Sequence, residues 1–367
     1  MKYKLSEIGR IVTGKTPSTK NKSSFSEEPD KYLFATPRDM NGSEKTIKET
    51  ERYLTDEVTN TFKNLVINDK SICVSCIGTI GKVFMPSGPA ITNQQINSIT
   101  EIKNFVLPDY LYYYLTIHQK DIENLAGGTT MPIVNKTSFE QLEVEIPDLE
   151  TQKKIVRILS ALDQKIELNN KIRDNLLRVA HQIYINDVKS LPTVKTEKLG
   201  SLCKIKYGKG LPTSKILKSG YRVYGGNGII GFYNEKMYDG SQVLISCRGA
   251  ASGKVIFTRP ECFVTNNSLI LECDEKYHYY IKEFSLDREY YDYTTGSAQP
   301  QITIDNIKDV ELPLPNNEVL TKFNTALCPI EKKFFAILDE NEALAKLRDT
   351  LLPKLMSGEI NLGDIQL

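Results

Sequence analysis

The sequence LSEIGRIVTGK at residues 5–15 recurs in diverged form as LGSLCKIKYGK at residues 199–209. In both segments three aliphatic residues, spaced three apart, lead into a Gly-Lys pair. Further segments repeat in the same order: Cys76–Phe84 with Cys247–Phe257, Thr92-Asn93 with Thr265-Asn266, Tyr110–Tyr114 with Tyr277–Tyr280, Gly128-x3-Pro132 with Gly296-x3-Pro300, and Glu143–Pro147 with Glu311–Pro315. Because internal repeats set the whole architecture, the sequence predicts two copies of one structural unit.

Each copy has the same two-part composition. Its first part holds short apolar, β-branched runs, such as residues 71–77 and 242–246, separated by Gly and Pro. This pattern is typical of a mostly β globular domain. Its second part is a long predicted helix, which Asp148 can cap in the first copy and Asn316 or Asn317 in the second.

The two predicted helices carry a seven-residue hydrophobic period, which is the mark of helices that wind around each other. A helix over residues 149–185 would be about 55 Å long at about 1.5 Å per residue, longer than one small domain can cover. The alternative is two amphipathic helices, each packed on its own domain. Asn169 either fixes the register of the pair or interrupts the seam near solvent. The predicted seam residues are Ile155, Leu159, Leu162, Ile166, Asn169, Leu176, Ile183, Phe323, Leu327, Ile330, Phe334, Ile337, Leu344 and Leu351.

We therefore predict an α+β protein with a pseudo-twofold internal repeat. Two similar β-rich globular domains, residues 1–148 and 187–315, are joined and separated by two long antiparallel coiled-coil helices, residues 149–186 and 316–367 with the C-terminal tail. Modules that engage one face of duplex DNA need separations near one helical turn, about 34–36 Å, or its multiples. A rigid spacer with a domain at each end suits a split DNA target.

Composition favours a cytoplasmic protein with no membrane partner. The chain is 40% hydrophobic and 25% charged, which is ordinary for a soluble globular protein. No run approaches the eighteen or so uninterrupted apolar residues of a membrane span, and the first residues lack the apolar core of a secretory signal. Seven cysteines without framework spacing fit a reducing compartment.

The net charge of +1 conceals an uneven distribution. Residues 186–259 hold thirteen Lys and Arg against four Asp and Glu, and residues 1–24 hold six against Glu7 alone. Such a basic region is either a solvent-exposed face without a partner or a surface that contacts nucleic-acid phosphates.

Gly9–Thr16 matches the phosphate-binding pattern G-x4-G-K-T. That loop must follow a buried strand and open a helix. The eight residues before it include three charged ones, Pro17 follows it, and the second copy has Cys203 and Gly210 in place of the first glycine and the threonine. We interpret it as a turn whose lysine can meet DNA phosphate.

Other catalytic and metal patterns are also incomplete. Cys73-x2-Cys76 has no second pair, and the three histidines stand in no ligand pattern, so we expect no metal site. Asp163-x-Lys165 and Glu331-x-Lys333 resemble part of a nuclease motif, but they lie on the predicted helices as flanking charges. We expect no catalytic residue in this chain.

Several segments, in their order, resemble the specificity subunit of type I restriction–modification systems. They are Ile146-Pro147 leading through Gln152 and Ile155 to Leu162-Asp163, YGGNGIIG at residues 224–231, Gly253-Lys254-Val255, and LLPKLMSGEI at residues 351–360. The resemblance covers essentially the whole chain, although the first domain lacks a good copy of the Gly-Gly-Asn-Gly segment.

The resemblance implies two target-recognition domains, each binding one half of an interrupted site in double-stranded DNA. The paired helices would set the gap and dock two methyltransferase subunits, which bring S-adenosylmethionine for adenine methylation. Translocating nuclease subunits would bring ATP and Mg²⁺. On this basis no cofactor is bound by this chain.

Phosphate contacts need Lys, Arg and polar groups on loops, and base recognition needs paired donors and acceptors. Each candidate is also compatible with an ordinary surface or turn position. The competing functions are an adaptor that binds proteins or glycans and a nucleotide-driven enzyme built on Gly9–Thr16. The predicted DNA-binding residues are Lys15, Thr16, Lys20, Lys22, Arg38, Lys82, Thr129, Thr130, Lys209, Lys215, Arg222, Asn227, Arg248, Lys254, Ser297 and Gln299.

Overall fold

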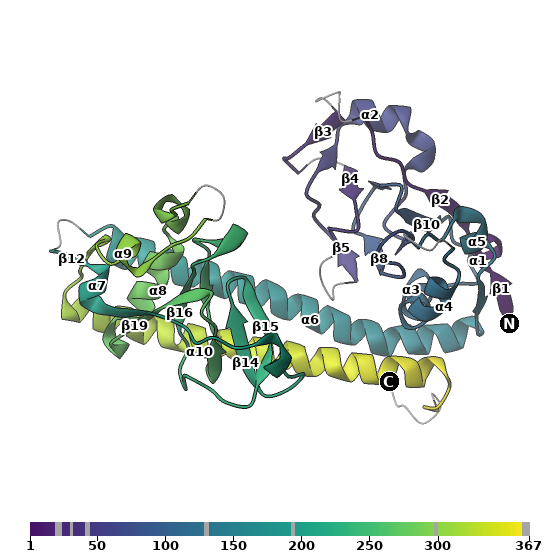
Figure 1. Cartoon of the computed structure of the whole chain (residues 1–367). Helices are drawn as coiled ribbons and strands as arrows, with labels where there is room; N and C mark the ends of the chain where they lie inside the picture. Colours follow the sequence, from purple (N-terminus) through teal and green to yellow (C-terminus); the bar gives the residue numbers. More distant parts are fainter. Residues whose placement is uncertain are drawn as a thin grey trace. The chain divides into compact units, whose positions relative to one another are not determined.

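The computed structural model describes residues 1–18, 24–29, 32–40, 45–127, 132–191, 195–296 and 300–361 (Figure 1). The chain forms two compact units. Unit 1 comprises residues 1–168 and 341–367, and unit 2 comprises residues 169–340. Each unit contains one β-rich globular part, called head 1 (residues 1–148) or head 2 (residues 187–315), and one portion of each long helix. None of the described helices is both long enough and apolar enough to cross a membrane.

Head 1 contains a five-stranded sheet in the order β2-β10-β7-β8-β5, a four-stranded sheet in the order β3-β6-β4-β9, and a β1-β11 ladder. Its elements are β1 (Lys2–Lys4), α1 (Leu5–Ile8), β2 (Arg10–Thr13), β3 (Phe25–Ser26), β4 (Tyr32–Ala35), β5 (Thr46–Ile47), β6 (Tyr53–Leu54), α2 (Asp56–Thr61), β7 (Ile72–Ser75), β8 (Val83–Pro86), β9 (Ala90–Thr92), β10 (Ile96–Thr100), α3 (Pro108–Ile117), α4 (Gln119–Asn124), α5 (Lys136–Glu140) and β11 (Glu143–Glu145).

Head 2 contains sheets in the orders β13-β19-β16-β17 and β15-β14-β18, and a β12-β20 ladder. Its elements are β12 (Thr196–Lys198), α7 (Leu199–Leu202), β13 (Cys203–Tyr207), β14 (Tyr221–Gly225), β15 (Gly228–Tyr233), β16 (Val243–Ser246), β17 (Val255–Phe257), β18 (Cys262–Val264), β19 (Ser268–Cys273), α8 (His278–Leu286), α9 (Ile304–Ile307) and β20 (Glu311–Pro313).

The strand orders confirm the internal repeat. The order β2-β10-β7-β8 in head 1 is matched by β13-β19-β16-β17 in head 2, and the ladder β1-β11 by β12-β20. The parallel pair of β4 with β9 is matched by the parallel pair of β14 with β18. Head 1 additionally has β3 and β5, in the region where the first copy of the sequence is longer.

The repeated segment that begins each copy builds the core. Leu5 and Ile8 lie on the buried face of α1 with no exposed surface, and Leu199 takes the same place in α7. Ile11 continues into β2 and remains buried. The tyrosines that follow are also core residues, since the side chains of α3 pack into the same hydrophobic cluster as Leu5. The spacing of three therefore marks one buried face that runs from a helical turn into a strand.

The two long helices are α6 (Leu149–Tyr184) and α10 (Asn317–Met356). Asp148 caps α6, because its carboxylate accepts hydrogen bonds from the backbone N–H and hydroxyl of Thr151 at 2.9 and 2.8 Å, and these bonds lower the pKa of Asp148. Asn316 caps α10, where its Oδ1 accepts from the backbone N–H of Val319 at 2.9 Å. α10 ends shortly before Gly358, whose φ of 76° favours glycine.

The helices run antiparallel within each unit. In unit 1, Asp163 bonds Arg348 at 2.9 Å. In unit 2, Asn169 donates to Glu340 at 2.9 Å, and the rings of Tyr184 and Phe323 lie 6.4 Å apart farther along. Asn169 is only 1% exposed, so this polar seam residue is buried and bonded to the facing helix.

The seam residues make two kinds of contact. Ile155 and Leu159 pack into the core of head 1 together with Leu352, and Phe323 and Leu327 pack into the core of head 2. Between these ends the positions are mostly half-buried, with Ile337 1% exposed. The remaining half-buried positions are Leu162, Ile166, Leu176, Ile183, Ile330, Phe334, Leu344 and Leu351. The same period therefore serves both helix pairing and attachment to the heads.

Candidate nucleic-acid interface

The Gly-Lys pair of each repeat docks on the Thr-Asn turn of the same repeat. A Cβ on Gly14 would lie 2.1 Å from the carbonyl oxygen of Thr92, and one on Gly208 would lie 2.3 Å from that of Thr265. Only glycine permits this approach, since real Cβ contacts are longer. The backbone N–H of Lys15 donates to Thr92 O at 2.9 Å.

The same arrangement presents one exposed lysine in each head. The backbone N–H of Lys209 donates to Val264 O at 2.9 Å, and the side chains of Lys15 and Lys209 are both exposed. Arg10–Thr13 form β2, so the segment Gly9–Thr16 runs along a strand. Residues 14–18 belong to no helix, so the Gly-Lys-Thr segment does not open a helix as a phosphate-binding loop does.

Two further loops meet the Thr-Asn turn in head 1. The backbone N–H of Asn93 donates to Ala35 O at 3.0 Å, and that of Cys76 donates to Gln95 O at 2.7 Å. These bonds join the loop after β4, the turn between β7 and β8, and the turn between β9 and β10. We call residues 14–16, 36–40, 76–82 and 92–95 together loop cluster 1.

Head 2 has an equivalent set of loops with equivalent bonds. The backbone N–H of Thr265 donates to Tyr224 O at 2.9 Å, and that of Cys247 donates to Asn267 O at 2.9 Å. We call residues 208–209, 225–228, 247–254 and 265–267 loop cluster 2. The two clusters come from corresponding positions of the two sheets.

A lysine of the Gly-Lys-Val segment ties two of the loops together in each cluster. Lys82 Nζ donates to Met40 O at 3.4 Å, and Lys254 Nζ donates to Asn227 Oδ1 at 2.7 Å. The residues Thr36–Met40 therefore stand in head 1 where head 2 has its Gly-Gly-Asn-Gly turn.

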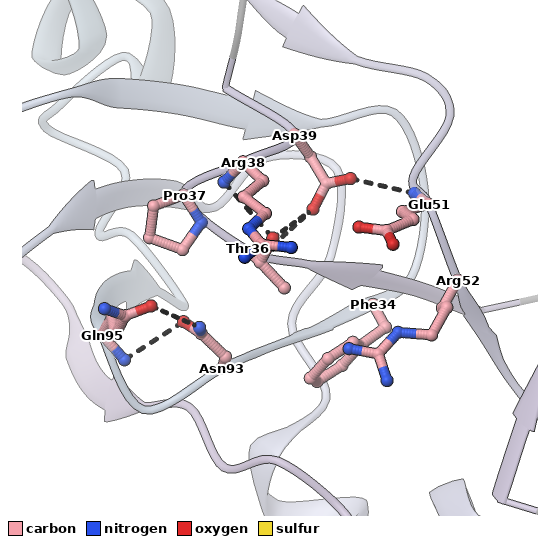
Figure 2. A pocket seen from close by; sticks show the side chains of 9 residues that line it. All are labelled: Phe34, Thr36, Pro37, Arg38, Asp39, Glu51, Arg52, Asn93 and Gln95. Carbon is pink, nitrogen blue, oxygen red and sulfur yellow. Dashed lines mark hydrogen bonds between the residues drawn. The ribbon is translucent and has the colours of Figure 1, made fainter. Parts of the chain in front are cut away.

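Loop cluster 1 borders a pocket of about 330 Å³ (Figure 2). Asp39 connects two segments that line the pocket. Its carboxylate accepts hydrogen bonds from Thr36 N and Thr36 Oγ1 at 2.7 Å and from Glu51 N at 2.9 Å. Asn93 Nδ2 donates to Gln95 Oε1 at 2.9 Å in the lining of the same pocket. The lining residues are Phe34, Thr36, Pro37, Arg38, Asp39, Glu51, Arg52, Asn93 and Gln95. Arginine and amide groups on a polar concave surface can hydrogen-bond the edges of bases.

A second pocket, of about 300 Å³, lies in head 2 beside Lys209. Two other lysines that line it are already neutralised. Lys236 pairs with Asp239 and Glu261 at 2.7 Å, and Lys206 pairs with Glu272. No acidic group of the described chain forms an ion pair with Lys209, which leaves its charge available for a phosphate.

The remaining predicted DNA-binding residues are distributed unevenly. Arg248 and Lys254 are exposed in loop cluster 2, and Arg38 is exposed in loop cluster 1. Lys215 is exposed on a separate 3-10 turn. Arg222 is half-buried with its guanidinium 4.0 Å from the Asp339 carboxylate on α10, so its charge is directed at the helix. Lys20, Lys22, Thr129, Thr130, Ser297 and Gln299 lie outside the described residues.

The structure adds residues that sequence reasoning missed. Gln94 and Gln95 lie in loop cluster 1, where Gln94 Oε1 is 2.6 Å from Thr16 Oγ1, and Arg52 lines the pocket. The match of Thr92-Asn93 with Thr265-Asn266 was the signal for the two glutamines, because they follow it directly. Arg52 had no such signal.

The thiols of Cys73 and Cys76 are buried beneath this surface. Burial raises the pKa of Cys73 to about 12 and that of Cys76 to about 11, which keeps both thiols protonated and unreactive. Among the described residues no group of three His, Cys, Asp or Glu side chains is placed to hold a metal ion.

Comparison with known proteins agrees with this architecture. A family model described as the type I restriction modification DNA specificity domain matches residues 1–178 and 193–347. The MjaIX type I restriction enzyme specificity subunit of Methanocaldococcus jannaschii is 24% identical over 409 residues, covering 99% of this chain and 94% of that protein. The HindI specificity subunit of Haemophilus influenzae is 37% identical over 189 residues, covering 47% and 39%.

The fold is shared with a solved structure of the same class. The crystal structure of the type I restriction–modification S subunit from M. genitalium superposes with a TM-score of 0.54 at 19% identity, covering 97% of this chain and 95% of that one. The family model covers both repeats and most of the chain. The protein therefore belongs to the family of type I restriction–modification DNA specificity subunits, with two target-recognition domains.

Proposed function

We propose that this chain reads a bipartite target in double-stranded DNA, with head 1 recognising one half of the site and head 2 the other. The observation that carries the proposal is the equivalence of the two loop clusters. In each cluster the Gly-Lys pair packs against the Thr-Asn turn. The backbone N–H of its exposed lysine donates at 2.9 Å to Thr92 O in head 1 and to Val264 O in head 2. Two equivalent surfaces on duplicated domains suit two half-sites separated by a gap.

The long helices complete this proposal. α6 and α10 set the gap and dock two methyltransferase subunits, which bind S-adenosylmethionine and methylate adenine. Translocating nuclease subunits use ATP and Mg²⁺, and the whole complex acts in the cytoplasm. The chain recognises the DNA sequence, and its partner subunits carry out methylation and cleavage. The comparisons give no support to the adaptor alternative.

Methylation mapping tests the proposal. The chain is expressed with its methyltransferase subunits in a host that lacks adenine methylation, and the methylated positions of the host DNA are sequenced. We expect one motif with two specified halves around an unspecified gap. A contiguous motif, or methylation that depends on the chain but has no sequence preference, would refute a bipartite reader.

Lys15→Ala and Lys209→Ala are expected to weaken DNA binding without changing sequence preference. Each lysine neutralises about one phosphate in the proposed complex, so each variant should reduce the slope of log affinity against log salt by about one. The measurement is a salt titration of binding to target and random duplexes by the complex with methyltransferase subunits.

Lys198→Ala is the matched control, since the Lys198 ammonium is exposed and paired with Asp309 at 2.7 Å. Its slope should equal that of the wild type. Unchanged salt slopes for both Lys15→Ala and Lys209→Ala would show that these lysines do not contact DNA phosphates.

A further inference from the structure

The strands β4 and β14 end at equivalent residues of the two heads. Ala35 on β4 pairs with Thr92 on the parallel strand β9, and Tyr224 on β14 pairs with Val264 on the parallel strand β18. The residue that follows each partner donates its backbone N–H back across the pair, to Ala35 O at 3.0 Å and to Tyr224 O at 2.9 Å. Register and hydrogen bonds therefore agree that Tyr224 is the counterpart of Ala35.

A four-residue turn follows this strand end in each head. In head 1 residues 36–39 form a turn, which is closed by a backbone hydrogen bond of 3.1 Å between its last and first residues. In head 2 residues 225–228 form a turn whose first and last residues are strand partners. Each turn begins directly after the equivalent strand residue. Its third residue, Arg38 in head 1 and Asn227 in head 2, therefore occupies the same position of the repeat, and both residues are exposed.

The turn that carries Arg38 is fixed by its own side chains. The Asp39 carboxylate accepts hydrogen bonds from the backbone N–H and hydroxyl of Thr36 at 2.7 Å and from Glu51 N at 2.9 Å (Figure 2). Arg38 lines the adjoining pocket together with Gln95. An ordered turn lowers the entropy that is lost on binding. The planar guanidinium that it carries matches the two acceptors, O6 and N7, of guanine in the major groove.

The side chain of Asn227 is held by a lysine. Lys254 Nζ donates to Asn227 Oδ1 at 2.7 Å. The turn also lies close to the end of β16, since a Cβ on Gly226 would be 2.8 Å from Ser246 Oγ. The lysine bond uses one lone pair of Oδ1 and leaves the second lone pair and the Nδ2 hydrogens for a ligand. An asparagine amide with these groups pairs with N6 and N7 of adenine.

We propose that Arg38 and Asn227 are equivalent specificity-determining residues of the two half-sites. Arg38 selects guanine at one position of the half-site read by head 1, and Asn227 selects adenine at one position of the half-site read by head 2. Different side chains on the same turn let the duplicated heads recognise different bases. This inference rests on the proposed function and adds to it the base preference of one position in each half.

The test uses the full chain in complex with its methyltransferase subunits and duplexes in which each base pair of the target is varied in turn. Arg38→Ala should reduce the preference for guanine at one position about ten-fold, because one bidentate pair is lost. Asn227→Ala should reduce the preference for adenine at one position of the other half by a similar factor. All other positions should keep their wild-type preference.

Two conservative variants guard against loss of the turns. In Arg38→Gln the glutamine amide pairs with adenine N6 and N7, so the preference at that position should shift from guanine to adenine. Asn227→Asp keeps an acceptor for Lys254 but removes the Nδ2 donor. An aspartate accepts a hydrogen bond from cytosine N4, so this variant should shift the preference from adenine to cytosine.

Arg10→Ala and Asn234→Ala are the matched controls. Arg10 is an exposed head 1 arginine that pairs with Glu101 at 2.9 Å. Asn234 is an exposed head 2 asparagine that follows β15, at the end of the strand opposite the turn. Neither variant should alter the preference at any position.

Two results would overturn the assignment. One is a wild-type pattern of preferences in either Arg38→Ala or Asn227→Ala. The other is an equal loss of affinity of Arg38→Ala on every sequence with a salt slope reduced by about one, which would make Arg38 a phosphate contact. A wild-type complex that prefers no split target at all would instead refute the proposed function itself, and the inference with it.

Discussion

A heptad inserted into both long helices is expected to lengthen the gap between the half-sites by about three base pairs. Seven residues add about 10 Å at about 1.5 Å per residue, and duplex DNA rises about 3.4 Å per base pair. The insertions belong after Leu168 in α6 and after Glu340 in α10, at the boundary of the two units. A heptad preserves the seven-residue period of the seam. Methylation mapping measures the result, and the original site should no longer be methylated.

The half-sites themselves should remain unchanged by this double insertion. An insertion in α6 alone is the control, since it leaves seven residues of α6 without partners on α10 and should abolish methylation at both gap lengths. If the double insertion altered the half-site bases, or left the gap as it was, the helices would not be the element that measures the gap.

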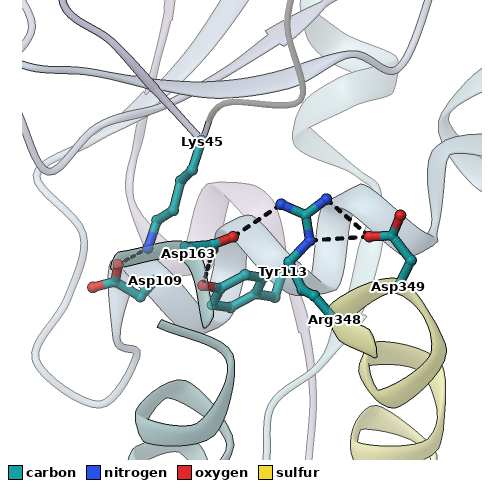
Figure 3. A network of polar contacts seen from close by, with 6 residues as sticks. All are labelled: Lys45, Asp109, Tyr113, Asp163, Arg348 and Asp349. Atoms are coloured by element: carbon teal, nitrogen blue, oxygen red, sulfur yellow. Dashed lines mark hydrogen bonds and ion pairs between the residues drawn. The ribbon is translucent and has the colours of Figure 1, made fainter. Parts of the chain in front are cut away.

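Arg348→Met is expected to release the last part of α10 from unit 1. Arg348 Nη1 bonds Asp163 Oδ1 at 2.9 Å, and the two side chains are only 13% and 15% exposed (Figure 3). Tyr113 on α3 donates to the other oxygen of the same carboxylate. Removing one partner leaves a largely buried charge, which costs about 3 kcal/mol. Hydrogen exchange of residues 341–356 should accelerate by up to about a hundred-fold.

The double variant Asp163→Leu with Arg348→Met should recover most of the lost protection, because replacing both charges removes the uncompensated one. Arg157→Met is the control, since Arg157 is exposed on the same part of α6. Unaltered exchange in the single variant Arg348→Met would show that the apolar contacts of Leu352 and Leu355 suffice to hold the helix.

Several features of the fold could be predicted from short segments of the sequence. The Gly-Lys pairs and the Thr-Asn turns repeat in the sequence, and the structure places each pair on its turn. The match of the turns is wrong by one residue, because the bond from Lys15 N to Thr92 O is equivalent to the bond from Lys209 N to Val264 O. The helix predicted at residues 149–186 corresponds to α6, Leu149–Tyr184. The second ends at Met356 because Gly358 supplies a backbone conformation that stops it.

The residues that contact DNA were harder to predict from the sequence. Arg222 is among the predicted DNA-binding residues, but its guanidinium lies 4.0 Å from the carboxylate of Asp339, which is distant in the sequence. Arg52 was overlooked, although it lines the pocket with Gln95. Charge and residue type identify which side chains can meet DNA, but not the direction in which each one points.

The amino-acid sequence alone predicts the duplication, the alternation of β-rich domains with long helices, and the apolar period of the seam. These features are visible in the spacing of residues along the chain, because a helix or strand that buries one face must repeat apolar residues at a fixed interval. The folded chain was needed to show that residues 36–40 take the place of the Gly-Gly-Asn-Gly turn, that Arg52 lines a pocket with Gln95, and that Asn169 is buried against Glu340. Strand order and helix register bring together residues that are distant in the chain, and no local pattern records which ones will meet.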